Sequence, residues 1–300
     1  MAKFGAHRVF LASHLLRPSK RIAWNADIGK EMSHSVPQSP EEIILFKIVS
    51  WNVNSIRARK DRVLSWLDEN QPDVVCVQES KVVDELFPHE DLASVGYQAV
   101  VHGQKTYNGV ALLTKVPASD VVRGFVDGGD DSQARFIGAT VSGVRVFSAY
   151  TPNGSSVGSD KYQYKLEWLA RLRAYLNRAE SSDTPLALCG DWNVAPEARD
   201  IHDPLLWEGG LLCTDLERQA LQKIVDWGLA DCYRKHCQDA NFSWWDYRML
   251  GFPKNKGLRI DHIYATPSLY GQCVSATIAR EERKGKGASD HAPVVATFDW

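Results

Sequence analysis

Several patterns that would place a protein in a familiar class are missing from this chain of 300 residues. None of its six cysteines belongs to a Cys-x-x-Cys pair, which removes the usual sequence signal of a zinc or redox site. Lys and Arg number 35 against 37 Asp and Glu, so the net charge of −2 does not itself indicate a nucleic-acid-binding protein. No run of about 18 apolar residues is present, which excludes an ordinary membrane-spanning helix.

Further absences narrow the chemistry. The glycines that follow Lys284 lack the spacing of a Walker loop, so the sequence gives no sign of a nucleoside triphosphate site. No Ser or Cys stands in a motif that pairs it with a base as a nucleophile. Disorder is excluded as well, since 44% of the residues are hydrophobic and 10% are aromatic. Cys76 and Cys189 lie inside apolar runs, which predicts buried, reduced thiols in a reducing compartment.

The first 42 residues differ in composition from the remainder. Apolar and basic residues alternate over residues 7–17, and no acid occurs before Asp27, as in a basic amphipathic targeting peptide. An unselected extension has the same appearance, and we favour it because no clear small-residue cleavage site follows. Residues 33–40 are rich in Ser and Pro and are typical of a linker. We therefore expect residues 1–42 to be an extension and residues 43–300 to be a single domain.

Polar side chains recur at the ends of short apolar runs that are typical of buried strands. The residues in these positions are Asn52, Glu79, Tyr150, Asp191, Asn193, Asp261, Asp290 and His291. A helix is predicted between the first two runs, over about Ser55–Asn70, and parallel strands joined in this way end at the same edge of a sheet. Asn52 and Glu79 are therefore expected to lie side by side.

The second half of the chain repeats this plan. A long helix is predicted from about Lys161 to Ala179, with Leu166 on its buried stripe, and Thr214 to Glu217 has the form of a capping box. A strand is predicted from Leu258 to Ala265, and the last strand begins near Ala292. Strands interleaved with helices in this number predict two sheets packed face to face, with helices on their outer faces.

The polar strand ends share one kind of chemistry. They supply four acids, two amides, one imidazole and one phenol, and no thiolate. Hard oxygen ligands of this kind favour Mg²⁺, with Mn²⁺ as a substitute, over zinc. A magnesium site beside an imidazole is typical of phosphate-ester hydrolysis, because a cation neutralises the phosphate while another group activates water.

From about Phe46 to Trp300 the chain resembles the bacterial branch of the exonuclease III family of apurinic/apyrimidinic endonucleases. The motifs that carry the resemblance are Trp-Asn-Val-Asn-Ser-Ile-Arg, Val-Gln-Glu-Ser-Lys, Tyr-Asn-Gly-Val-Ala-Leu-Leu-Thr, Tyr-Thr-Pro-Asn-Gly, Gly-Asp-Trp-Asn-Val-Ala-Pro, Gly-Leu-Arg-Ile-Asp-His-Ile-Tyr-Ala and Ser-Asp-His-Ala-Pro-Val. The resemblance implies a four-layer α/β sandwich and Mg²⁺ dependence. It also implies incision 5′ to abasic sites in double-stranded DNA, with 3′-to-5′ exonuclease and 3′-phosphatase activity on blocked ends. A cytoplasmic, nucleoid-associated monomer is expected, in preference to organellar targeting by residues 1–30.

The resemblance further implies roles for individual residues. The metal-site residues are Glu79 as the main ligand, with Asn52, Asp191, Asn193 and Asp290. The catalytic residues are Tyr150, Asp191, Asn193, Asp261 and His291. Within this set Asp261 fixes His291, and whether Asp191 or His291 is the general base stays open. Asn54 stands where some relatives have an acid that assists metal binding.

Substrate contacts are implied in the same way. The residues are Asn153 at the scissile phosphate, Trp244, Leu258 and Ile260 around an abasic deoxyribose, and Arg57, Arg59, Lys105 and Arg248 along the DNA. Leu258 and Ile260 alternate on the predicted strand and would form one wall of the pocket. Basic clusters at positions 57–62, 248–259 and 283–286 adjoin the motifs and favour a phosphate-binding rim.

Two other functions remain as alternatives. A phosphodiesterase of the same superfamily would act on a lipid or inositol phosphate, but such relatives generally have a second His where this chain has Tyr150. A catalytically silent DNA-binding module would lack one or more of the acids, and none is missing.

Overall fold

The computed structural model describes residues 45–129 and 132–300, and the expectations for residues 1–42 lie outside these ranges. The strands are β1 (Leu45–Asn52), β2 (Val74–Gln78), β3 (Gln98–His102), β4 (Val110–Thr114), β5 (Ser119–Arg123), β6 (Phe136–Val141), β7 (Val144–Tyr150), β8 (Leu186–Asp191), β9 (Ala230–Asp231), β10 (Trp244–Trp245), β11 (Gly257–Leu258), β12 (Asp261–Ala265), β13 (Cys273–Ile278) and β14 (Val294–Asp299). The helices are α1 (Lys60–Asn70), α2 (His89–Ser94), α3 (Asp160–Ala179), α4 (Pro204–Trp207), α5 (Asp215–Val225), α6 (Cys232–His236) and α7 (Pro267–Gly271). Among the described residues, no helix combines the length and apolar character that crossing a membrane requires.

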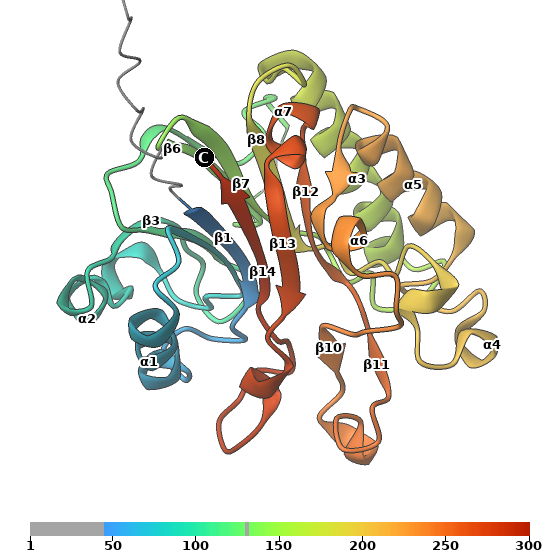
Figure 1. The fold of residues 1–300 in the computed structure, drawn as a ribbon. Coiled ribbons are helices and arrows are strands. Elements are labelled where there is room, and N and C mark those ends of the chain that lie inside the picture. The colour runs from blue at the N-terminus through green and yellow to red at the C-terminus, as the bar shows by residue number, and fades with distance from the viewer. Residues whose placement is uncertain (1–44, 130–131) are drawn as a thin grey trace, which may run out of the picture. The chain divides into compact units, whose positions relative to one another are not determined.

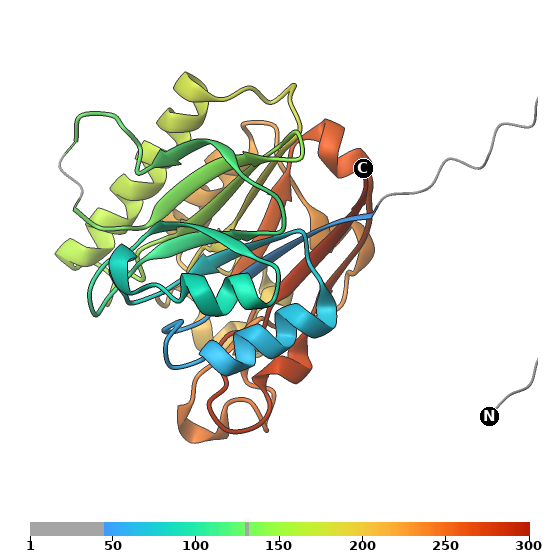
Figure 2. The same ribbon diagram turned by 90° about the vertical axis from the view of Figure 1, so that its left-hand side faces the viewer.

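Two six-stranded sheets form the body of the described chain. One sheet has the order β13-β14-β1-β2-β4-β3 and the other β5-β6-β7-β8-β12-β9, while β10 and β11 form a separate two-stranded ribbon. The neighbours β1 and β2 are parallel, as are β7 and β8, and the remaining named pairs are antiparallel. Helices α1 and α2 flank the first sheet and α3 and α5 the second, on opposite sides in Figure 1, and Figure 2 shows α1 and α2 in front.

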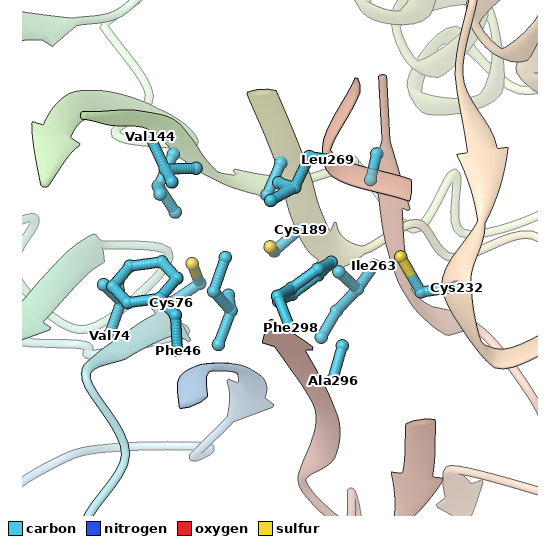
Figure 3. Packing of buried hydrophobic residues seen from close by; sticks show 14 of the residues in the cluster. Phe46, Val74, Cys76, Val144, Cys189, Cys232, Ile263, Leu269, Ala296 and Phe298 are labelled. Carbon is cyan, nitrogen blue, oxygen red and sulfur yellow. The ribbon is translucent and has the colours of Figure 1, made fainter. Parts of the chain in front are cut away.

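The main apolar core lies between the two sheets. Phe46 and Cys76 of the first sheet belong to the same buried cluster as Val144, Cys189 and Ile263 of the second, as Figure 3 shows. Two further clusters pack each sheet against its own helices. The four-layer α/β sandwich with mixed sheets is therefore confirmed. All six cysteines lie in the described part of the chain and are free, as expected.

Helix α1 begins at Lys60, later than the predicted start at Ser55. Asn54 and Ser55 have φ angles of 47° and 88°, which a helix does not accept. The N–H of Ser55 instead donates to the carbonyl of Glu79 at 2.7 Å. The loop after β1 is thus tied to the loop after β2, and this tertiary contact delays the helix.

The predicted strand from Leu258 to Ala265 is wrong in one respect, because it is broken into β11 and β12, which belong to different sheets. The break lies at Arg259, whose N–H donates to the carbonyl of Asp200 at 2.8 Å instead of to a strand neighbour. The guanidinium is buried and forms ion pairs with Asp200 and Asp231 at 2.6 and 2.7 Å. The charge of Arg259 can be buried only if both carboxylates neutralise it. To reach them, the backbone of Arg259 leaves the strand pairing, and its N–H binds Asp200 instead.

The two helices on the second sheet begin with side-chain caps. Ser159 caps α3 by accepting from the N–H of Tyr162, and Thr214 forms the predicted capping box with Glu217 at α5. Such caps contribute about 1 kcal/mol each. On α3 the fully buried stripe contains Lys165, whereas Leu166 is only partly buried, contrary to the predicted stripe.

Candidate active site

The polar strand ends of both sheets meet at one edge. The register places Asn52 opposite Gln78 in the parallel pair β1/β2, and Tyr150 opposite Asp191 in the pair β7/β8. The amide nitrogen of Asn52 donates to Glu79 at 2.8 Å and to Asp191 at 2.9 Å. One buried amide therefore joins a carboxylate that follows the first sheet to a carboxylate of the second.

Glu79 stands in the left-handed region, with φ of 55°, immediately after β2. The hydroxyl of Tyr150 donates to its Oε1 at 2.9 Å, and the ammonium of Lys81 lies 2.6 Å from its Oε2. Burial raises the pKa of Glu79, but Lys81 and Asn52 outweigh burial and bring that pKa below its ordinary value. Glu79 is thus ionised and points into the group of acids.

His291 is held by Asp261. Its Nδ1 lies 2.9 and 3.1 Å from the two carboxylate oxygens of Asp261, and Ser243 donates its hydroxyl to the same carboxylate at 2.6 Å. Burial lowers the pKa of His291, yet the Asp261 and Asp191 carboxylates together raise that pKa to about 10. The ring is therefore a cation at neutral pH, with Nε2 directed toward Asp191 at 3.8 Å.

Asp191 lies at the centre of the group and is almost completely buried. Its Oδ1 accepts from the N–H of Asn193 at 3.0 Å, and its Oδ2 accepts from Asn52. Burial, reinforced by the neighbouring Asp261 and Glu79, raises the pKa of Asp191 to about 7 although His291 opposes the shift. The nearby charge of His291 is therefore insufficient to keep the Asp191 carboxylate fully ionised at neutral pH.

Asp290, next to His291 in the chain, is held by two further donors. It accepts from the Asn54 amide at 2.9 Å and from the Trp244 indole N–H at 3.1 Å. Burial raises the pKa of Asp290, but His291 and these two donors bring that pKa below its ordinary value. Asn54 stands where some relatives have an acid. In this chain its amide donates to an acid, Asp290.

The amides of the two following loops lie together. Asn153 donates to the Asn193 side-chain oxygen at 3.1 Å, and the Asn193 amide donates to the carbonyl of Thr151 at 3.0 Å. Next to them is an open cavity of about 790 Å³ that Tyr150, Asn153 and Lys161 help to line. The predicted site residues at the strand ends are therefore brought to one place.

The predicted substrate residues fall into two groups. Arg57, Lys105 and Arg248 are exposed, whereas Arg59 donates to the Asn54 carbonyl at 2.6 Å and to the Tyr247 hydroxyl at 3.0 Å. Leu258 and Ile260 are buried in a cluster with Leu212, and Trp244 packs on its edge half-buried.

Two of the predicted basic clusters include buried members. Arg259 is 1% exposed and neutralised by Asp200 and Asp231, so its expected place on the phosphate rim is wrong. Arg283 is also buried and donates to the carbonyl of Trp245.

Two contributors to the site were not predicted. Lys81 lies between Glu79 and Asn54, and its position two residues after Glu79 was the available sequence signal. Ser243 binds the carboxylate of Asp261 and also accepts from the N–H groups of Ile260 and Asp261. The sequence gives no sign of that contact, because 18 residues separate Ser243 from Asp261.

The sequence pattern of the Endonuclease/Exonuclease/phosphatase family matches residues 49–291. The chain belongs to this family. Exodeoxyribonuclease III of Haemophilus influenzae is 38% identical over 265 residues, which are 84% of this chain and 99% of that protein. A solved 3′ phosphatase from Neisseria, bound to a product DNA hairpin, has a TM-score of 0.82 and 39% identity, with 85% of this chain and 100% of that chain covered. An AP endonuclease from Archaeoglobus fulgidus has the same TM-score, identity and coverage.

These matches confirm the predicted exonuclease III family and its class of phosphodiester hydrolase. Members of the Endonuclease/Exonuclease/phosphatase family depend on a metal, and a group suited to hold one is present. Ligand atoms of Glu79, Asp191 and His291 lie within 4.8 Å of one another, and the two carboxylates are the ones suited to a cation, because the protonated ring of His291 has no free lone pair.

Proposed function

We propose that this chain is a DNA repair nuclease that uses Mg²⁺ to hydrolyse the phosphodiester bond 5′ to abasic sites in duplex DNA. A 3′-to-5′ exonuclease and 3′-phosphatase activity on blocked ends belongs to the same proposal. The observation that carries it is the joining of Glu79 and Asp191, from different sheets, by the Asn52 amide, with protonated His291 beside them. Relatives with this fold are named for each of these activities.

The donor set fits a hard divalent cation. Glu79, Asp191 and Asp290 offer carboxylate oxygens, with Asn52 and Asn193 close by, and no thiol is among them. The raised pKa of Asp191 indicates that this buried group lacks positive charge, which a divalent cation would supply. Glu79 would be the principal ligand. When bound, Mg²⁺ neutralises phosphate charge and polarises a phosphoryl oxygen, and Mn²⁺ would substitute for it.

The remaining roles follow from contacts within the chain. His291, protonated and oriented by Asp261, would donate from Nε2 to a phosphate oxygen. That assignment leaves Asp191 as the group that orients or deprotonates the attacking water, because a cationic imidazole cannot accept a proton. Tyr150 and Asn153 would hold the scissile phosphate at the edge of the 790 Å³ cavity.

We further propose that residues 43–300 are the catalytic domain and that residues 1–42 are not required for it. The family pattern supports this division, since it begins at residue 49. A monomer in the bacterial cytoplasm, close to the nucleoid, fits an enzyme that acts on chromosomal DNA. Arg57, Arg59, Lys105 and Arg248 would contact the duplex, and Trp244, Leu258 and Ile260 would border the abasic sugar.

The deciding experiment is a nicking assay on a labelled duplex that carries one tetrahydrofuran abasic analogue, with an intact duplex as the control. We expect cleavage 5′ to the analogue at millimolar Mg²⁺, none with a chelator, and recovery when Mg²⁺ or Mn²⁺ is restored. Removal of a 3′-phosphate from a nicked duplex tests the end-processing activity. Hydrolysis of an inositol phosphate without DNA cleavage would replace the proposal with the phosphodiesterase alternative, and binding without any cleavage would favour the silent module.

A further inference from the structure

A buried lysine lies directly beneath the two asparagine loops of the nuclease site. Lys165, on α3, is 0% exposed, and its ammonium donates to the main-chain carbonyl of Asn193 at 2.7 Å and to that of Asn153 at 3.3 Å. Its third partner is the carboxylate of Glu217, also 0% exposed. An ammonium has three protons, so every donor of Lys165 is used.

Glu217 connects this lysine to a second helix. Its Oε1 also accepts from the N–H of Leu212 at 3.1 Å, while its Oε2 accepts from the N–H and the hydroxyl of Thr214 at 3.0 and 2.8 Å. The same carboxylate therefore completes the capping box of α5 and neutralises Lys165. Burial lowers the pKa of Lys165 and Glu217 opposes that shift, so the cation depends on its partner.

The contacts place Lys165 where it sets the geometry of both loops at once. Asn153 follows β7 and Asn193 follows β8, and their side chains meet at 3.1 Å. Asn193 has a φ of 49°, a conformation that needs support from its surroundings. By holding the carbonyl oxygens of both residues, the ammonium fixes the two loops against each other, with the Asn153 side chain at the cavity beside Tyr150 and the Asn193 side chain hydrogen-bonded to it.

We propose that Lys165, neutralised by Glu217, is a positioning residue that aligns the amides of Asn153 and Asn193 for the phosphate. Apolar side chains would hold α3 in place with a smaller desolvation penalty, because replacing a buried ion pair by apolar groups often leaves the stability of a protein unchanged or raises it. The buried pair of Lys165 and Glu217 is explained if it fixes the conformation of the two loops that carry Asn153 and Asn193. This inference rests on the proposed nuclease activity.

The test compares Lys165→Met with Leu169→Ala, a matched control. Leu169 is 1% exposed, lies four residues after Lys165 on the same helix and belongs to the apolar cluster that packs this helix on the second sheet, and its side chain has no polar atom to bind the loop carbonyls. At a temperature where both variants are folded, we expect Lys165→Met to lower kcat on the abasic duplex about 100-fold with little change in KM. Leu169→Ala should lower the melting temperature and leave kcat unchanged.

Two further variants separate positioning from stability. Lys165→Met with Glu217→Gln removes both charges, so it should recover part of the melting temperature lost by Lys165→Met alone while kcat stays low. In a background with Asn153→Ala and Asn193→Ala, Lys165→Met should cost no further activity, because the groups that it positions are gone. A full 100-fold loss in that background, or a normal kcat in the intact one, would overturn the inference.

A readout independent of catalysis is the ¹⁵N NMR spectrum of the side-chain amides. The Asn153 and Asn193 signals should shift or broaden in Lys165→Met and stay in place in Leu169→Ala. Unmoved signals would refute the positioning role even if the wild-type chain cleaved no duplex. Failure of the proposed function itself would appear separately, as a wild-type chain that does not cleave abasic DNA while its amide signals still respond to Lys165→Met.

Discussion

The contact between Asp261 and His291 gives the sharpest prediction. Ser243 donates its hydroxyl to Oδ2 of Asp261 at 2.6 Å, while its own oxygen accepts from the N–H groups of Ile260 and Asp261 at 3.1 and 3.0 Å. Because a hydroxyl has one proton and two lone pairs, Ser243 has no place for another donor. In Asp261→Asn the amide nitrogen must therefore turn away from Ser243 and toward His291.

Asp261→Asn thus destabilises the protonated ring of His291 in two ways. The new amide N–H takes the place of Oδ1, 3.1 Å from Nδ1 of His291, and meets a second donor there. Loss of the carboxylate also removes the largest influence that raises the pKa of His291 to about 10, so this pKa falls. A hydrogen bond between charged groups contributes about 1.5–3 kcal/mol. If the hydrogen bond between Asp261 and His291 is lost only in the transition state, the rate of DNA cleavage falls roughly 10- to 150-fold.

Single-turnover cleavage of the abasic duplex measures the effect, with the exposed Asp239 changed to Asn as a control that should behave as wild type. Asp261→Asn should cost nearly as much as His291→Asn, and the double variant should be no slower than the slower single one. An NMR titration should show the His291 ring losing its proton at a lower pH in Asp261→Asn than in the wild type. Losses that multiply in the double variant, or an unchanged ring titration, would refute the coupling.

Three further predictions concern the metal, the lesion and the extension. Glu79→Gln should remain folded by circular dichroism and lose most turnover at millimolar Mg²⁺, and near-normal activity without extra metal would remove Glu79 as the principal ligand. Trp244→Ala should weaken discrimination between abasic and intact duplex by about 1–3 kcal/mol in competition assays, whereas unchanged selectivity or loss of the cooperative melt would show a purely structural role. Removal of residues 1–42 should leave the melting temperature and incision rate about the same, and a large drop in melting temperature would show that the extension contributes to the fold.

Features that depend on neighbouring residues were predictable from the sequence. The alternation of apolar runs and helical stripes predicted the parallel pair that ends at Asn52 and Glu79, and Thr214 and Glu217 form the capping box three residues apart. Because parallel strands joined by a helix must end at one edge, the convergence of Asn52 with Glu79 followed from the same local pattern. The proximity of Asn52 and Glu79 was therefore predicted before any distance was known, and the roles of the two residues stay predictions.

Features that depend on distant partners were missed. Arg259 breaks the predicted strand because Asp200 and Asp231, 59 and 28 residues away, neutralise its charge in the interior. Lys165 is buried because Glu217 lies opposite it, 52 residues later. Hydrophobic patterning places charged residues at the surface, and it has no means of recognising a cation whose counter-ion comes from another element.

Residues of both sheets meet at the candidate active site, so the geometry of this small site depends on the whole domain. Asn52 belongs to the first sheet and Asp191 to the second, and 139 residues separate them in the chain. The 2.9 Å contact between them is possible only if the core between the sheets fixes their separation. Phe46 lies in that core on β1, which ends at Asn52, and Ile263 on β12, which begins at Asp261, and their packing maintains the distance between the acids. Close packing resists small displacements, so the sandwich serves the reaction by holding the acids of both sheets at ligand distance.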